Sequence, residues 1–416
     1  MSLRTQRGLL RTAVLAVAVA LLCGGCRSKP PDGLAAAPSM VSATPAPQLP
    51  PATPATTPRG SVDIYAHTRA GMLSPAVAGD PALVYVPNLA DGTVSVIDQA
   101  SLRVVDLLKV GREPQHVVPA WDLRTLWVNN NRGNSLTPID PRTGRLAGPA
   151  VPVGDPYNLY FTPDGTSAVV MAEARHEIDF DDPHTFAEQS RLTLDGRCRG
   201  VNHVDFSADG RYFIATCEFS GQLVKVDVAS RSVVGYLDLN AHGAAAPQDI
   251  KSDPYGRVWY VADMNAAGLH EIDGDAFRET GFLPTGPETH GLYPSRDGRD
   301  LYVANRGGML TRKSPPFPHS GDAGSVSVVD FHTRRVVATW PIPGGGTPDM
   351  GNVSADGTRL WLSGRRSNEV YVFDTGGGDP ARGHLLARIP VGREPHGLAV
   401  WPLPGRFSLG HTGILR

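Results

Sequence analysis

Residues 83–98 read LVYVPNLADGTVSVID, two short apolar stretches on either side of a turn-forming LADG. Both are rich in β-branched and aromatic residues, and the second alternates apolar with polar positions, as a half-buried β-strand does. The first stretch recurs at a period of about forty to fifty residues, the length of a four-stranded propeller blade. Its further copies are 126–130 (LWVNN), 168–172 (AVVMA), 212–216 (YFIAT), 258–263 (VWYVAD), 301–305 (LYVAN) and 360–363 (LWLS). The repeat therefore predicts an all-β, seven-bladed β-propeller.

The order of strands inside a blade follows from the motifs between these copies. Asp-Gly pairs at 164–165, 209–210, 297–298 and 356–357 precede four of the copies, and Asp-Gly favours tight hairpin turns. Each blade is expected to run from an inner strand through this turn to a second, a third and an outer strand. The folded region begins with a second-type strand at 83–88 and ends with an inner-type strand at 396–401. We therefore expect the C-terminal strand to complete the first blade and close the ring.

These motifs resemble a known family of repeats. LYVAN at 301–305, TVSVID at 93–98 and Pro395-His396-Gly397, together with the Asp-Gly turns, are similar to the YVTN-type (YncE-like) β-propeller repeat. The resemblance covers nearly all of residues 82–404. It is specific for the fold and says little about activity, because the motif residues form turns and core.

The N-terminal residues carry the pattern of an export signal. Arg4, Arg7 and Arg11 precede an apolar run at 12–22 that is too short to span a bilayer. Gly24-Gly25-Cys26 resembles the bacterial lipobox, although Cys23 stands where that pattern prefers leucine. Residues 1–25 are therefore predicted to be a lipoprotein signal peptide, with Cys26 lipidated and the exported protein anchored on the outer side of the cell membrane. Cleavage to a soluble secreted form and retention as an uncleaved anchor are the alternatives.

Composition divides the rest of the chain into two parts. Residues 26–61 are rich in Pro, Ala and Thr and poor in large apolar side chains, which predicts a disordered tether. Residues 62–416 are expected to form the propeller. Cys198 and Cys217 remain in this part, and an exported protein favours a disulfide between them over two buried thiols. Their spacing is not that of a zinc site.

Charge and missing motifs exclude several functions. Lys and Arg total 39 against 41 Asp and Glu, a net charge of −2, which gives no basis for nucleic-acid binding. The sequence has no serine-hydrolase Gly-x-Ser-x-Gly motif, no zinc-protease His-Glu-x-x-His motif, no Gly-Lys-Ser/Thr phosphate loop and no haem-attachment Cys-x-x-Cys-His motif.

We expect a monomer whose partners are the membrane, through Cys26, and either an envelope protein or a small molecule.

Polar residues stand at the start of every inner strand, where seven strands converge on the channel mouth. Imidazole and carboxylate groups suit both a divalent metal ion and acid-base chemistry. The alternative is the polar lining of a hydrated channel. The candidate ligand-binding residues are His116, Asn158, His203, Asp249, His290, Asp349 and His396.

Arginines in the loops after the second strands are expected on the same face. Arg132, Arg306 and Arg365 would favour a carboxylate or phosphate ligand. Pairing with nearby acidic residues is the alternative, and the candidates for it are Glu113, Glu173, Glu218 and Glu394.

The leading hypothesis is a cell-envelope lipoprotein whose propeller face binds a partner or a small, anionic ligand without catalysis. A propeller enzyme is the first alternative, since streptogramin lyase is a propeller that uses His, Glu and a divalent cation. Similar repeats carry haem in nitrite reductases. By these resemblances four histidines would be catalytic or ligating, namely His116, His203, His290 and His396. An adhesin or assembly factor is a third hypothesis.

Overall fold

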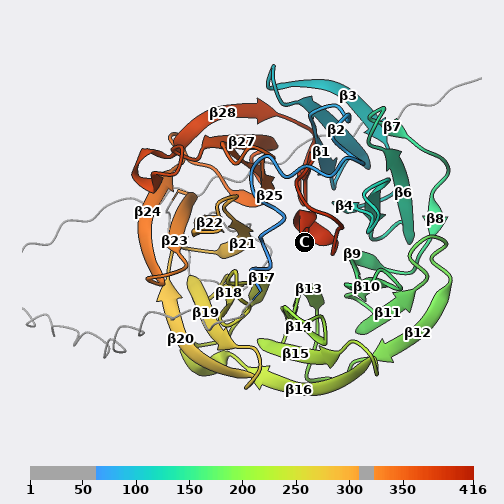
Figure 1. Cartoon of the computed structure of the whole chain (residues 1–416), viewed down its shortest axis with the longest axis vertical. Coiled ribbons are helices and arrows are strands. Elements are labelled where there is room, and N and C mark those ends of the chain that lie inside the picture. The colour runs from blue at the N-terminus through green and yellow to red at the C-terminus, as the bar shows by residue number, and fades with distance from the viewer. Residues whose placement is uncertain (1–61, 309–322) are drawn as a thin grey trace, which may run out of the picture. The chain divides into compact units, whose positions relative to one another are not determined.

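The computed structural model describes residues 62–308 and 323–416. In this part of the chain seven antiparallel sheets surround a central channel, and the colours in Figure 1 follow the chain once around the ring. The predicted seven-bladed, all-β propeller is therefore confirmed. The predicted signal peptide, the tether and Cys26 lie outside the described residues. No helix in the described part is long and apolar enough to cross a bilayer.

The first four blades have the following strands, given from the channel outward. Blade 1 contains β29 (Ala399–Trp401), β1 (Leu83–Asn88), β2 (Thr93–Asp98) and β3 (Arg103–Lys109). Blade 2 contains β4 (Pro114–Pro119), β5 (Leu126–Asn130), β6 (Ser135–Asp140), β7 (Arg145–Leu146) and β8 (Val151–Pro152). Blade 3 contains β9 (Pro156–Phe161), β10 (Ala168–Ala172), β11 (Glu177–Asp181) and β12 (Glu188–Thr193). Blade 4 contains β13 (Val201–Phe206), β14 (Tyr212–Cys217), β15 (Gln222–Asp227) and β16 (Ser232–Asp238).

The other three blades follow the same order. Blade 5 contains β17 (Pro247–Ser252), β18 (Trp259–Asp263), β19 (Gly268–Asp273) and β20 (Arg278–Pro284). Blade 6 contains β21 (Thr289–Pro294), β22 (Asp300–Asn305), β23 (Ser325–Asp330) and β24 (Arg335–Pro341). Blade 7 contains β25 (Pro348–Val353), β26 (Arg359–Gly364), β27 (Glu369–Asp374) and β28 (His384–Pro390). Short 3-10 helices occur at η1 (Asn240–His242), η2 (Pro380–Arg382) and η3 (His411–Gly413).

The asparagine that ends several second strands joins that strand to the third. In blade 2 the Asn130 amide donates to Thr137 Oγ1 at 2.8 Å and to Ser135 Oγ at 3.2 Å. Its Oδ1 accepts the Gly111 N–H at 2.9 Å. Asn88 and Asn305 make equivalent bonds to Thr or Ser in their own blades. The repeat motif therefore keeps Asn and Ser/Thr because these buried polar groups satisfy one another.

Apolar side chains pack between neighbouring blades. Trp361 of β26 and Trp401 of β29 lie in one buried cluster with valines of β1 and β2, so blades 7 and 1 share a core. Inner and second strands are almost entirely buried, whereas the outer strands of blades 6 and 7 alternate exposed and partly buried positions. Because each blade packs on the next, the core is a continuous ring.

The C-terminal strand closes the ring as predicted. β29 pairs antiparallel with β1, with Leu83 opposite Trp401. The Trp401 indole donates to Asp80 Oδ2 at 2.8 Å, and Gln99 Nε2 donates to the Trp401 carbonyl at 2.8 Å. The inner edge of the first blade is therefore covered by residues from the other end of the propeller.

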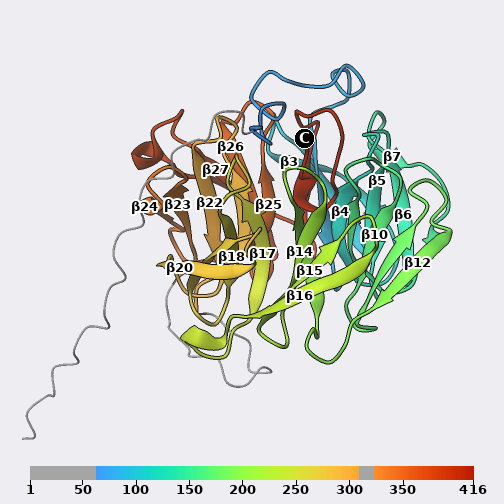
Figure 2. The same ribbon diagram turned by 60° about the horizontal axis from the view of Figure 1, so that its bottom comes forward.

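Two segments outside the blades cover the face that carries the Asp-Gly turns. The N-terminal segment 62–82 crosses this face, and the C-terminal tail 402–416 enters the channel from it (Figures 1 and 2). The Tyr65 hydroxyl donates to the Ser252 carbonyl at 3.0 Å, and Arg416 Nη2 donates to Asp205 Oδ1 at 3.1 Å. Residues 62–82 were assigned to the propeller, but they form a cover on the ring and contribute no blade strand.

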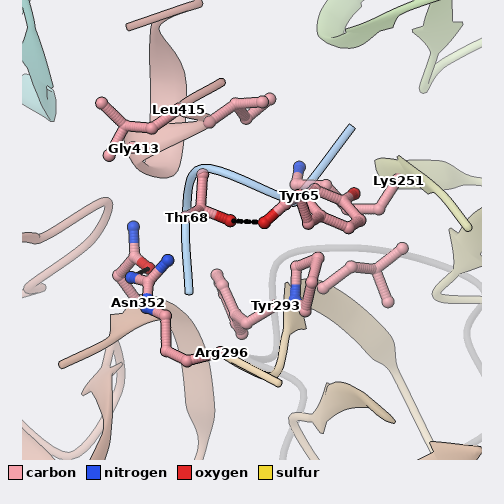
Figure 3. Close-up of a pocket in the computed structure, with 11 residues that line it drawn as sticks. Tyr65, Thr68, Lys251, Tyr293, Arg296, Asn352, Gly413 and Leu415 are labelled. Carbon is pink, nitrogen blue, oxygen red and sulfur yellow. Dashed lines mark hydrogen bonds between the residues drawn. The ribbon is translucent and has the colours of Figure 1, made fainter. Parts of the chain in front are cut away.

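A small cavity of about 30 Å³ lies under this cover. Figure 3 shows two lining residues from the N-terminal segment, Thr68 and Tyr65, with Thr68 Oγ1 donating a hydrogen bond to the Tyr65 carbonyl at 3.1 Å. The other labelled lining residues are Lys251, Tyr293, Arg296, Asn352, Gly413 and Leu415. A space of this size holds a water molecule or two, so the covered face has no room for a larger ligand at this point.

Blade 4 holds the two remaining cysteines in a disulfide. Cys198 and Cys217 are bonded, 19 positions apart in sequence, and both are buried in the cluster shared by blades 3 and 4. The expected cross-link is therefore present in the structure.

Candidate functional site

The predicted site residues occupy equivalent places at the start of the inner strands. In blades 2 to 7 the pairing of inner and second strands is irregular there, within 114–116, 156–158, 201–204, 247–250, 289–292 and 348–351. An irregularity of this kind redirects a side chain out of the regular alternation of a strand. The repeat therefore directs one polar side chain per blade toward the channel.

The structure brings the predicted histidines together. The ring centroids of His116 and His396 are 4.9 Å apart, and those of His203 and His290 are 6.2 Å apart. A fifth histidine, His411 of η3, lies among them, with its centroid 4.2 Å from that of His116 and 4.8 Å from that of His203. We call these five residues the histidine cluster.

The histidine cluster is enclosed. The seven predicted channel residues, from His116 to His396, each expose at most 2% of their surface, and His411 is fully buried. The C-terminal tail contributes to this burial, because it enters the channel from the other face. Burial, together with nearby positive charge, holds the pKa of His116, His203, His290, His396 and His411 well below the ordinary value. The imidazoles are therefore neutral at pH 7.

Two of the predicted carboxylates have cationic partners. Asp349 Oδ1 accepts Arg306 Nε at 2.9 Å and Nη2 at 2.6 Å. Burial lowers the pKa of Arg306, but the charge and hydrogen bonds of Asp349 raise it more, so the guanidinium stays charged. Asp249 Oδ1 accepts Lys251 Nζ at 2.7 Å. Arg306 and Asp349 were both predicted at the channel mouth, and the structure pairs them as buried side chains.

The predicted Asn158 fixes the orientation of a histidine. Its amide donates to the Asn202 carbonyl at 3.0 Å, and the same nitrogen lies 3.3 Å from His203 Nδ1. An amide nitrogen can only donate, so His203 Nδ1 accepts and its Nε2 carries the proton. Asn158 is therefore a positioning residue for the cluster.

The predicted arginines separate into three environments. Arg132 is exposed and pairs with Glu113 at 3.1 Å, so for this residue the acidic pairing that we considered is what the structure shows. Arg306 pairs with Asp349. Arg365, in the loop between β26 and β27, is half-buried, and its guanidinium makes no ion pair or hydrogen bond with any described residue.

The charge of Arg365 acts on groups from most of the ring. It lowers the pKa of His116, His290 and His396 and also acts on Glu173 and Glu218. These groups come from five blades other than that of Arg365. Arg365 therefore lies close to the axis, above the histidine cluster. We use channel mouth for the region of Arg365, Tyr157, Glu173 and Glu218.

The pKa values of the two glutamates of the channel mouth are raised, because their charged forms are unfavourable there. Burial, with the charges of Glu218 and Asp155, raises the pKa of Glu173 to about 8. Burial also raises the pKa of Glu218, although Asn202 Nδ2 donates to its Oε2 at 3.0 Å. At pH 7 Glu173 is therefore largely protonated and does not neutralise Arg365.

Several buried polar atoms around the cluster have no hydrogen-bond partner among the described residues. Buried polar atoms without partners are uncommon in native structures, and a bound ion or water usually accounts for them. These atoms are His116 Nε2, His203 Nε2, His396 Nε2, Asp349 Oδ2 and both ring nitrogens of His411.

His411 was not among the predicted residues, because it lies outside the repeat. Lys251 was not among them either, although it stands two positions after Asp249. A histidine in the tail and a lysine facing the channel carry no periodic signal. Only the path of the tail identifies the first, and only the inner-strand register identifies the second.

Comparison with known proteins agrees with the fold. A model of the YncE-like β-propeller family matches residues 62–405. The chain belongs to the YncE-like β-propeller family. No curated protein sequence matches the chain.

Solved structures share the fold of this YncE-like propeller at low sequence identity. A functionally unknown protein from Desulfotomaculum acetoxidans has a TM-score of 0.61 and 14% identity, covering 77% of this chain and 98% of its own. Kuenenia stuttgartiensis hydrazine synthase gives 0.53 and 18%, covering 68% and 87%. The dihydro-heme d1 dehydrogenase NirN gives 0.53 and 13%, covering 80% and 77%. At these identities the likeness concerns the fold alone, and function must be argued from the site.

Proposed function

We propose that this YncE-like propeller is an exported, lipid-anchored binding protein that holds a small anionic ligand at its channel mouth, without catalysis. The observation that carries the proposal is Arg365. It is a half-buried guanidinium near the axis that forms no ion pair or hydrogen bond with any described residue. A guanidinium fork matches a carboxylate or a phosphate, and such charge-assisted bonds are among the strong ones.

The surroundings of Arg365 support an anion over a cation. Glu173, whose pKa is raised to about 8, is protonated at neutral pH and offers a hydrogen-bond donor to an anionic oxygen. The Tyr157 hydroxyl has its pKa raised well above the ordinary value by burial and by the charges of Glu173 and Glu218, so it also stays a donor. One charged and two neutral donors then face the mouth.

The opening of the channel on the opposite face is covered. The N-terminal segment and the tail lie over the side of the Asp-Gly turns, and the cavity directly beneath them measures about 30 Å³. The absence of the common catalytic motifs is consistent with binding alone.

Export and lipid anchoring are part of the proposal on two grounds. The first is the signal and lipobox pattern ending at Cys26. The second is the Cys198–Cys217 disulfide, which is typical of proteins that fold outside the reducing cytoplasm. Labelling cells with a radioactive fatty acid tests the anchor: the wild-type chain should take up label and a Cys26→Ser chain should not. Equal labelling of the two would refute it.

Binding is tested by thermal unfolding of the full chain in acetate, citrate, inorganic phosphate and neutral glycerol. At least one anion should raise the melting temperature of the wild type, while glycerol at the same concentration should not reproduce the shift. Arg365→Gln should lose the shift. Arg132→Gln is the matched control, because Arg132 is exposed and paired with Glu113. No shift with any of these anions, or an equal shift in Arg365→Gln, would refute the proposal.

A further inference from the structure

One contact in the histidine cluster places two hydrogen-bond acceptors against each other. His396 Nδ1 lies 3.2 Å from the Gln115 carbonyl oxygen. A carbonyl oxygen can only accept, so Nδ1 carries the proton and Nε2 of the neutral ring carries a lone pair. That Nε2 lies 3.6 Å from Asp349 Oδ2 and forms no hydrogen bond.

The carboxylate side of this contact is equally fixed. Asp349 Oδ1 accepts two hydrogen bonds from Arg306, whereas Oδ2 has no partner among the described residues. Both residues are fully buried. Two electron-rich atoms that face each other away from water are unfavourable unless a cation or a proton lies between them.

His290 supplies the third ligand atom. Its Nδ1 lies 3.0 Å from Asp349 Oδ1 and 3.0 Å from Met350 Sδ, and because it faces a carboxylate it carries the proton of the neutral, metal-free ring. Binding an ion through Nδ1 would move this proton to Nε2. The three ligand atoms, one from each of His290, Asp349 and His396, all lie within 4.8 Å of one another. Zinc and similar ions bind nitrogen and oxygen at about 2.0–2.2 Å, so ligands around one ion are about 3–4 Å apart. The three side chains are therefore within a small adjustment of a common ion.

We propose that His290, Asp349 and His396 bind a transition-metal dication, zinc or copper, inside the channel. Two imidazoles and one carboxylate are a ligand set that such ions prefer over magnesium or calcium. The ligands come from β21, β25 and the segment before β29, so the ion joins blades 6, 7 and 1. The site lies below Arg365 and does not depend on an anion binding there.

The neighbours of the three residues are arranged as those of metal ligands are. Arg306 holds one oxygen of Asp349 and leaves the other available, and the Gln115 carbonyl fixes the ring of His396. Bonds of this kind orient ligands and set the tautomer that binds the metal. His116 Nε2 is a further nitrogen that could bind the ion, because it has no hydrogen-bond partner among the described residues. The ring centroids of His116 and His396 are 4.9 Å apart.

A proton is the competing occupant of the contact between His396 and Asp349. At 3.6 Å the two atoms are too far apart to share a proton in a hydrogen bond. A proton would also join these two atoms alone, whereas an ion can bind His290 as well, since the three ligand atoms lie within 4.8 Å of one another. The geometry therefore favours the metal, and direct measurement separates the two.

The test is metal content of the full chain, stripped with a chelator and then offered equimolar zinc or copper. After desalting, elemental mass spectrometry should find about one ion per wild-type chain, and loading should raise the melting temperature. Magnesium and calcium should do neither. His290→Gln and His396→Gln should each lower the affinity about tenfold or more, since each removes a ligand.

His203→Gln is the matched control. His203 is equally buried in the same cluster, but the Asn158 amide directs the proton to its Nε2, so the ring offers no lone pair to the ion. This variant should bind zinc as the wild type does. No stoichiometric metal in the wild type, or equal loss in His203→Gln and His396→Gln, would overturn the proposed site. The metal-free melting temperatures show whether each variant folds, and either ligand variant that folds is sufficient for the comparison.

Discussion

Removal of the Cys198–Cys217 disulfide should destabilise the propeller by an amount that its position allows us to calculate. The bond closes a loop of 19 positions. In the chain-entropy model this closure removes about 11 cal/mol/K from the unfolded state, or about 3 kcal/mol at 25 °C. The unfolding entropy of a domain of this size is roughly 0.7 kcal/mol/K, so the melting temperature should fall by about 4–5 °C.

The measurement compares a Cys198→Ala, Cys217→Ala double variant with the wild type in thermal and urea unfolding. Both sulfurs are buried in the core of blades 3 and 4, so a reductant reaches them only after unfolding. With excess reductant the wild type should therefore unfold near the midpoint of the variant, whereas the variant should not respond. A variant as stable as the wild type, or a variant that responds to reductant, would refute the reasoning.

Three further predictions concern single side chains. Asn130→Ala should cost about 2–3 kcal/mol in urea unfolding, because it leaves Thr137 and the Gly111 amide without their buried partner; a cost below about 0.5 kcal/mol would contradict this. Burial and neighbouring carboxylates raise the pKa of Asp181 to about 7, so ionisation lowers stability between about pH 4 and pH 7. Asp181→Asn should then stabilise the protein by about 1 kcal/mol at pH 8 and by less at pH 4.5, after allowance for solvent screening; the reverse order would be inconsistent with a raised pKa. Burial lowers the pKa of His270, but its bonds to Asp263 and Glu279 raise it more. The stability that protonated His270 contributes is therefore complete below about pH 6.5 and is lost as the pH rises through the raised pKa. Wild type should lose more stability than His270→Gln between pH 6 and pH 9, and parallel losses would show that His270 does not titrate in this range.

The repeated part of the fold could be predicted from sequence because every blade repeats the same local chemistry. The alternation in TVSVID at 93–98 has counterparts at 222–227, 325–330 and 369–374, and the Asn-to-Ser/Thr bonds of Asn130 recur at Asn88 and Asn305. The ring closure followed from counting strand types at the two ends, and β29 pairs with β1 as expected. The start of each inner strand was therefore a sound place to look for channel residues.

The rest of the site depends on contacts that no local pattern encodes. Arg306 pairs with Asp349 across 43 positions, between two blades, and this choice of partner depends on how neighbouring sheets pack. The tail that brings His411 into the channel has no repeat to align with. Its entry encloses the histidine cluster. Position along an inner strand could thus be predicted, whereas burial and partner choice could not.

The pairing of β29 with β1 also has a consequence for how the protein is made. Gln99 and Trp401 share a hydrogen bond although 302 positions separate them. During synthesis β1 therefore emerges long before its inner neighbour exists, and its free edge can pair with other chains in the meantime. Contacts of such long sequence separation also form slowly. A nascent chain of this protein has to be kept from aggregating until its last blade is complete, which makes it a natural client for a holding chaperone.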